Sequence, residues 1–199
     1  MKRFFALLIA LIMVCPLAFA VIPAKDTVVN SATYQVPEAI VEKNIQAQVD
    51  AYISSLEKEI SILRSDRDYT YRTEKVETKY VTRSGFPGNQ PTNGILFKTG
   101  GSFFWAETGG PTLDASVTFS DPFQMVSVTV DLGLKSESFT GCSINVPSKD
   151  AYYKLYVTKK MRVDKYVTYQ TSLITGETRV YKTTYPTDMD SYILDVVKV

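Results

Sequence analysis

An enzyme built from this sequence would have to rely on carboxylates, because its 199 residues include no histidine. Ser-His-Asp and Cys-His mechanisms are thereby excluded, together with the most common metal ligand. Asp114, Asp121 and Asp131 flank two strand-like runs, and a pair of carboxylates can hydrolyse glycosidic bonds. Acidic residues at strand ends are more often solvated turn formers. We therefore expect a protein that is not an enzyme, with a carboxylate-dependent glycosidase as the third hypothesis.

The same type of side chain could bind a metal ion. Loop oxygens from these carboxylates, or from Asp188 with Asp190 in an expected last loop, could contribute to a structural Ca²⁺ site, which needs six or more ligands. The sequence has no complete calcium-loop motif, no cysteine pair for zinc and no glycine loop for phosphate. We predict no cofactor, and structural Ca²⁺ stays a possibility.

Aromatic side chains are the remaining candidates for a site. The chain contains 13 Tyr, 10 Phe and one Trp, and Phe103, Phe104, Trp105 and Glu107 lie between two glycine pairs. A planar ring beside polar groups binds sugars or flat apolar ligands at little entropic cost. These four residues, next to a loop at 84–94, are the predicted ligand-binding site. Consecutive strand residues face opposite ways, so core packing is the competing interpretation for two of the three rings.

Residues 1–20 have the pattern of a secretory signal peptide: Lys2 and Arg3, an apolar run, and Ala18-Phe19-Ala20 as a cleavage site. The apolar run is shorter than the roughly 20 residues of a spanning helix, which argues against a transmembrane anchor. Met13-Val14 fits poorly with lipid attachment at Cys15. We expect a secreted protein, at the surface or outside of a bacterium, without a stable membrane anchor.

Removal of residues 1–20 would leave 179 residues with 20 basic and 21 acidic side chains, a net charge of −1. This balance gives no electrostatic case for binding nucleic acid. Cys142 would then be the single cysteine, so no intrachain disulfide could form. We interpret Cys142 as a small buried hydrophobe; an intermolecular bridge or a reactive thiol is the alternative. The lack of disulfides is compatible with bacterial export.

Two segments are expected before the β-rich part. Residues 21–36 have no sustained period and are predicted to be an extended, loosely held leader. Residues 37–65 begin with Pro37 and repeat apolar residues every three or four positions, which predicts a long amphipathic helix. We favour packing of this helix within the chain. An oligomerising coiled coil, with Glu42 and Glu59 at core positions, and a propeptide that is later removed are the alternatives.

Residues 69–199 predict a single β domain. The charged run that begins at Tyr69 is typical of an edge strand, and runs around 115–119 and 126–132 predict a hairpin. The longest alternation, 153–169, exceeds the usual strand length, so we expect a bend or bulge near Lys159 or Lys165. Gly176 lies in the turn of another hairpin. The predicted fold is mainly β, an antiparallel β-sandwich or jelly-roll-like domain preceded by one long helix.

The leading functional hypothesis is a secreted, non-catalytic β-sandwich that binds an extracellular ligand, such as a cell-envelope polysaccharide. The alternative is a secreted oligomerising or membrane-acting protein of the pore-forming type. Its motivation is the helix together with long strands of alternating polarity, a pattern that membrane hairpins share with ordinary amphipathic sheets.

Overall fold

The computed structural model describes residues 27–63, 67–87, 90–105, 141–147 and 150–199, and the backbone of 114–120 and 125–131. The chain is mainly β, with antiparallel strands and one helix, as the sequence predicts. The elements are β1 (Val28–Gln35), α1 (Glu38–Leu63), β2 (Tyr69–Gly85), β3 (Ile95–Phe97), β4 (Gly101–Trp105), β5 (Asp114–Ser120), β6 (Met125–Asp131), β7 (Cys142–Val146), β8 (Ala151–Ser172), β9 (Thr178–Thr184) and β10 (Thr187–Lys198).

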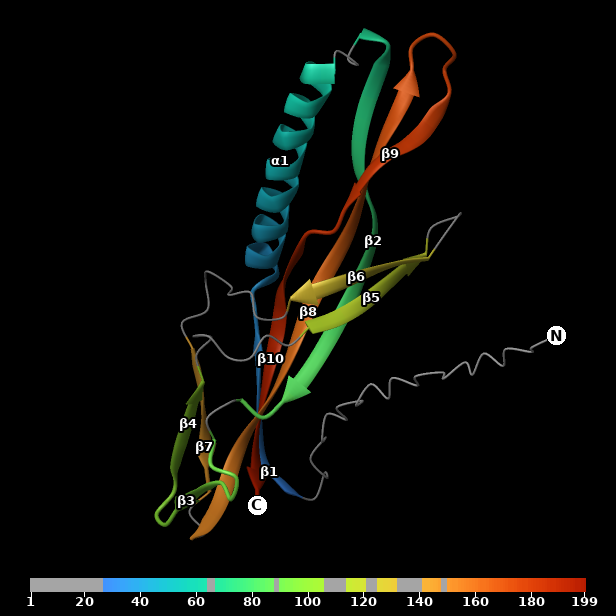
Figure 1. Ribbon diagram of the computed structural model, residues 1–199. Coiled ribbons are helices and arrows are strands. Elements are labelled where there is room, and N and C mark those ends of the chain that lie inside the picture. The colour runs from blue at the N-terminus through green and yellow to red at the C-terminus, as the bar shows by residue number, and fades with distance from the viewer. Residues whose placement is uncertain are drawn as a thin grey trace, which may run out of the picture.

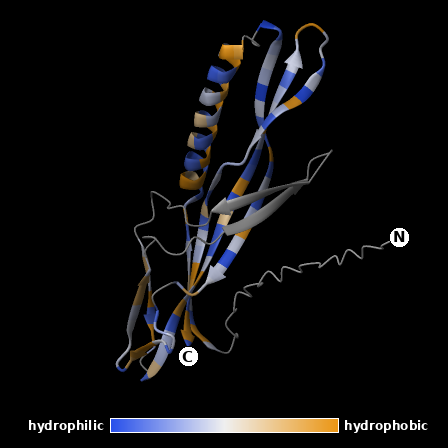
Figure 2. Ribbon diagram, viewed as in Figure 1, coloured by the Kyte–Doolittle hydropathy of each residue, from blue (hydrophilic) through white to orange (hydrophobic). Residues whose placement is uncertain are grey.

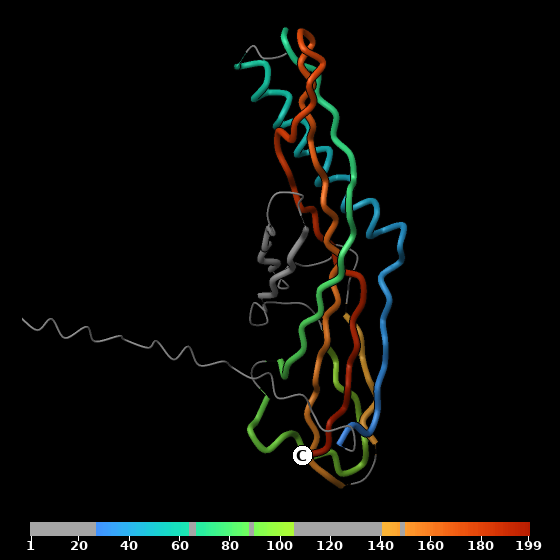
Figure 3. The backbone as a smooth tube through the Cα atoms, turned by 90° about the vertical axis from the view of Figure 1, so that its right-hand side faces the viewer, coloured from blue at the N-terminus to red at the C-terminus, as the bar shows by residue number. Residues whose placement is uncertain are grey.

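The molecule is elongated, and its main sheet runs along the long axis (Figure 1). The sheet has the strand order β1-β10-β8-β2, with β3 and β9 also paired to β8. The remaining strands form two separate pairs, β4 with β7 and β5 with β6. In the turned view of Figure 3, α1 lies along one half of the sheet and β4 and β7 along the other. Closure of these layers into a sandwich or jelly roll stays a prediction.

β8 is the central element of the sheet. Its 22 residues form one continuous strand, longer than the expected alternation. The bend or bulge predicted within this strand, near Lys159 or Lys165, does not interrupt it, and the extra residues lie in the neighbouring strands instead. β10 has an extra residue between Met189 and Ser191, and β2 has one between Lys75 and Glu77. An extra residue bends its own strand and increases the local twist, so the partner strands accommodate the length of β8 while β8 itself stays unbroken.

The predicted edge strand and hairpins are also present. β2 is the last strand of the sheet order, β5 pairs with β6, and β8 pairs with β9. Gly176 in the β8–β9 turn has a φ of 73°, a conformation that disfavours residues with a Cβ. The turn between β5 and β6, where the sequence has Asp121-Pro122, lies outside the described residues.

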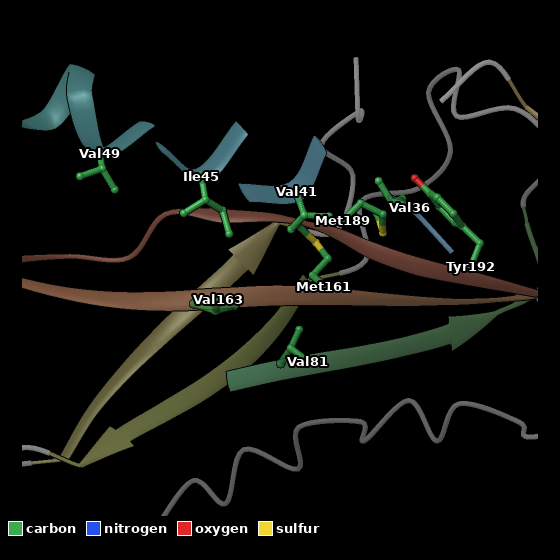
Figure 4. Close-up of a cluster of buried hydrophobic side chains, with 9 residues drawn as sticks. All are labelled: Val36, Val41, Ile45, Val49, Val81, Met161, Val163, Met189 and Tyr192. Carbon is green, nitrogen blue, oxygen red and sulfur yellow. The ribbon is translucent and has the colours of Figure 1, made fainter. Parts of the chain in front are cut away.

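α1 packs against its own chain, the arrangement that we favoured from the sequence. The apolar stripe contributes Val41, Ile45 and Val49 to a buried cluster with residues of the sheet. We call this cluster the helix core (Figure 4); its members are Val36, Val41, Ile45, Val49, Val81, Met161, Val163, Met189 and Tyr192. The observed helix spans Glu38–Leu63, and oligomerisation through it stays a prediction.

The segment before the helix differs from expectation. Residues 21–36 were predicted to be loosely held, but β1 pairs with β10 from Val28 to Gln35 and forms one edge of the sheet. Alternate residues of β1 are exposed, since an edge strand needs to bury only one face. The polar composition of residues 28–35 therefore did not indicate a strand, because hydrogen bonds to β10 stabilise it.

A second cluster, the hairpin core, lies between the β4–β7 pair and the main sheet. It consists of Phe103, Cys142, Ile144, Val146, Tyr153, Leu155, Val157, Leu194 and Val196. β8 and β10 contribute residues to both cores, so one pair of strands connects the two halves of the molecule.

Candidate binding face

The predicted site residues do not form one surface. Within β4, Phe103 is buried in the hairpin core, where its ring lies 5.2 Å from that of Phe97. Phe104 points the other way and is 68% exposed. This opposition follows from the alternation of side chains along a strand. Glu107 lies outside the described residues.

Trp105 lies between the two cores. It packs against both clusters and its ring centroid is 4.9 Å from that of Tyr192. The Nζ atom of Lys159 lies 5.3 Å from the centroid of the Trp105 ring, within the range of a cation–π contact. Trp105 is thus held by the fold as a packing residue that is still partly accessible.

Cys142 is buried in the hairpin core, as interpreted from the sequence. Burial raises the pKa of its thiol to about 11, because the apolar surroundings disfavour the thiolate. The described environment therefore gives this cysteine little nucleophilic character at neutral pH.

Aromatic rings instead gather on the face of β8 that points away from the hairpin core. Tyr153, Leu155 and Val157 fill that core, so the alternate residues of the strand lie on the opposite face. Leu96 pairs with Tyr152 and Ser84 with Thr158, which brings β3 and β2 alongside. We call this surface the aromatic face, defined by Tyr80, Phe86, Tyr152, Lys154, Tyr156 and Lys160.

Three rings of the aromatic face are accessible from solvent: Tyr80 is 49%, Tyr152 47% and Phe86 37% exposed. The ring of Phe86 stands nearly perpendicular to Tyr156, with centroids 5.0 Å apart. Tyr156 is buried, and its hydroxyl makes no hydrogen bond to the described residues. Because Tyr156 is buried, it supports the accessible ring of Phe86 from beneath.

Two lysines order these rings. The Nζ atom of Lys154 lies 5.5 Å from the Phe86 centroid, and that of Lys160 lies 4.1 Å from the Tyr80 centroid. Lys160 also pairs with the largely buried Asp190 at 3.0 Å. Cation–π attraction favours both contacts, so the aromatic face presents two of its rings beside positive charge.

Phe86 belongs to the 84–94 loop, and Gln90 fixes this loop to the sheet. The Gln90 Nε2 atom donates to the Leu155 carbonyl oxygen at 2.8 Å, and its Oε1 atom accepts from the Leu155 backbone N–H at 2.7 Å. The side chain thus satisfies a backbone position of β8 between the parts paired with β2 and β3. The sequence indicated a loop here but not this attachment.

Carboxylates that we considered for catalysis or metal binding have other placements. Asp114 and Asp131 face each other in the β5–β6 register, and Asp121 lies outside the described residues. Asp188 and Asp190 are not in a loop: both are buried in β10, where Asp188 Oδ2 accepts from Asn44 Nδ2 at 2.9 Å. Among the residues with described side chains, no group of three or more Asp, Glu or Cys side chains is arranged to hold a metal ion.

The strongest electrostatic cluster is internal. Arg162 is almost fully buried and donates to Asp164 at 3.0 and 2.8 Å, and it also binds Glu38 at 2.6 Å and Glu42 at 2.8 Å. Lys75 binds Asp164 at 2.9 Å. Glu42, which occupied a core position of the heptad pattern, is therefore the partner of a buried arginine. The cluster connects the start of α1 to the centre of the sheet.

No protein-family model matches this chain, and neither a curated protein nor a solved structure is significantly similar to it. In the part of the chain that the structure describes, no helix combines the length and hydropathy of a membrane-spanning segment.

Proposed function

We propose that this is an exported, non-catalytic protein that binds an extracellular ligand on the aromatic face, and that the ligand is a cell-envelope polysaccharide. The observation that carries the proposal is the grouping of Tyr80, Phe86 and Tyr152 as accessible rings on one side of the main sheet. Rings of this kind bind the apolar faces of sugars, while adjacent hydroxyl and amine groups bind sugar hydroxyls.

The length of the aromatic face favours a polymer over a single sugar. Tyr152 and Lys160 are eight residues apart in β8, which corresponds to roughly 26 Å along the strand. A pair of hydroxyl groups lies on the same face within this length, where Thr158 donates to Ser84 at 2.8 Å. A chain of linked sugars could therefore make several weak contacts at once.

Binding to insoluble cell-wall polysaccharide tests the proposal. We expect Tyr152→Ala and Tyr80→Ala each to weaken binding roughly tenfold, since one ring contact contributes about 1 kcal/mol beyond its buried area. Phe104→Ala, which removes an exposed ring from β4, is the matched comparison and should bind like the wild type. Far-UV circular dichroism reports whether each variant is folded.

The comparison with Phe104 also separates the two possible surfaces. Loss of binding in Phe104→Ala, with Tyr80→Ala and Tyr152→Ala unaffected, would place the ligand on the outer side of β4, as predicted from the sequence, and would overturn the aromatic face as the site. Equal binding by all variants would contradict a role for either set of rings.

A further inference from the structure

Four exposed aliphatic side chains gather at the end of the molecule opposite the C-terminus. Ile62 (79% exposed) and Leu63 (62%) end α1, while Leu173 (60%) and Ile174 (82%) lie where β8 turns toward β9. We call these four residues the apolar tip. Figures 1 and 3 both place the end of α1 and the β8–β9 turn at this end, and Figure 2 shows the hydrophobic colour there.

The fold places these two segments at the same end of the molecule although about 110 residues separate them in the sequence. The Leu173 N–H donates to the Asp68 carbonyl oxygen at 2.8 Å, which attaches the turn to the chain that follows α1. None of the four side chains belongs to either buried core. Exposed aliphatic groups concentrated on one projecting end, and not scattered singly, indicate an interaction site.

A layer of tyrosines lies directly behind the apolar tip. Tyr69 pairs with Ser172, and Tyr71 stacks edge-on against Tyr181 with ring centroids 5.2 Å apart. Tyr169 lies four residues before Leu173, a distance of roughly 13 Å along the strand. All four rings are half-buried. Tyrosine is enriched where a protein crosses from hydrocarbon to headgroups, because its ring is apolar and its hydroxyl is polar.

Arginines accompany the tyrosine layer. The Arg72 guanidinium carbon lies 5.9 Å from the Tyr169 centroid, and that of Arg179 lies 5.9 Å from the Tyr69 centroid. Arg72 also pairs with Glu74 at 3.2 Å. The tyrosines and these arginines therefore lie together behind the aliphatic residues, as aromatic and basic side chains do at a membrane interface, while Arg67, Asp68 and Glu177 lie in the two turns beside the aliphatic residues.

We propose that the apolar tip inserts into the surface of a lipid bilayer. A protein partner is a poorer fit, because a stable protein interface buries about 800 Å² on each side, whereas the tip is the narrow, convex end of an elongated molecule. A fluid bilayer accepts such a projection without a matching groove. The described charges nearby are balanced, with Arg67 and Arg179 against Asp68 and Glu177, so binding needs no anionic lipid and should persist in high salt.

The test must locate the tip itself, because the apolar run in residues 1–20 could bind lipid independently. In a Cys15→Ser background, an environment-sensitive fluorophore is attached to Ile174→Cys and, as the matched control, to Val199→Cys at the opposite end. Neutral phosphatidylcholine vesicles containing nitroxide lipid are then added. We expect a blue shift and strong quenching at position 174 and neither change at 199.

A second variant tests whether the aliphatic side chains cause the binding to vesicles. With the fluorophore on Ile62→Cys, replacement of both Leu173 and Ile174 by Asn should lower vesicle partitioning of the tip by more than about tenfold, because each buried aliphatic side chain contributes roughly that factor. Circular dichroism checks that the fold is kept.

Equal quenching at 174 and 199, or no effect of the two Asn substitutions, would overturn the proposal. A vesicle-free dimer that becomes monomeric in the Asn variant would assign the tip to a second copy and overturn it as well.

Discussion

Asp164 and Asp188 are both buried carboxylates near the start of α1, but their pKa values shift in opposite directions. Burial alone would raise the pKa of Asp164, and hydrogen bonds from Arg162, Thr78 and Lys75 outweigh this effect, so its pKa is lowered. Burial also raises the pKa of Asp188, and its bonds to Asn44 and to the Met189 backbone do not compensate. The ionised form therefore stabilises the fold at Asp164 and costs stability at Asp188.

Asparagine substitutions at these two positions should have opposite effects on stability. At pH 7, Asp164→Asn should lower the free energy of unfolding by about 3 to 5 kcal/mol, because Arg162 loses its main partner in a buried site. Asp188→Asn should raise it by up to about 1 kcal/mol, because it removes an ionised group that is poorly compensated. Urea denaturation at several pH values measures both.

The direction of each pKa shift also predicts how the stability change of each variant depends on pH. A lowered pKa provides stability above the ordinary Asp pKa that is lost as the pH falls, so the Asp164→Asn penalty should shrink as the pH falls below about 3.9, the ordinary Asp pKa. A raised pKa costs stability as the pH rises through it, so the Asp188→Asn gain should vanish under acid conditions. A loss in Asp188→Asn as large as that in Asp164→Asn would contradict this assignment.

At the scale of elements, α1 is fixed to the sheet by two kinds of contact. Val41, Ile45 and Val49 pack in the helix core, and polar contacts extend along the helix. The Tyr52 hydroxyl lies 2.9 Å from Thr168 Oγ1, and Lys182 Nζ lies 2.7 Å from Glu59 Oε2. Glu59, like Glu42, thus pairs with a cation of its own chain, although the heptad pattern placed it at a core position.

Truncation of the helix core tests this attachment. Ile45→Ala should lower the free energy of unfolding by about 2 to 4 kcal/mol, because Ile45 is fully buried and a cavity remains. Ile62→Ala is the matched control: its side chain is largely exposed, so the change should stay within about 0.5 kcal/mol. Chemical denaturation provides the measurement. Equal, small effects would support a helix that functions as a detachable propeptide or as an intermolecular stalk.

For the whole molecule, the central feature is that two cores share the same strands. β8 and β10 supply residues to the helix core and to the hairpin core, while Tyr34 and Trp105 pack against both. The Tyr34 hydroxyl also donates to the Ser143 carbonyl oxygen, which connects β1 to β7. The two halves of this elongated molecule are therefore joined by shared strands and shared packing contacts.

We expect the two halves to unfold in one transition. Phe103→Ala in the hairpin core should cost about 3 kcal/mol and shift the midpoint of both probes equally: Trp105 fluorescence, which reports the junction, and circular dichroism at 222 nm, which reports α1. A far-UV signal that keeps the wild-type midpoint while the fluorescence midpoint falls would show that the halves unfold separately.

Local periodicity determined the helix and most of the strands from the sequence alone. An apolar repeat without glycine or proline specifies α1, alternation specifies β8, a charged run typical of an edge strand specifies β2, and Gly176 specifies a turn, because these preferences depend only on residues a few positions apart. The strand at 28–35 was missed because its pairing with β10, and not its composition, stabilises it.

Only the tertiary structure decided which side chains share a surface. Tyr80 and Tyr152 belong to strands that meet through register, and Glu42 and Arg162 are more than 100 residues apart. Phe103 and Phe104 are identical in type and adjacent, yet one is core and one is exposed. Register and burial arise from contacts between distant segments, which a local pattern does not encode. The sequence therefore determined the elements, and long-range packing determined the aromatic face and the apolar tip.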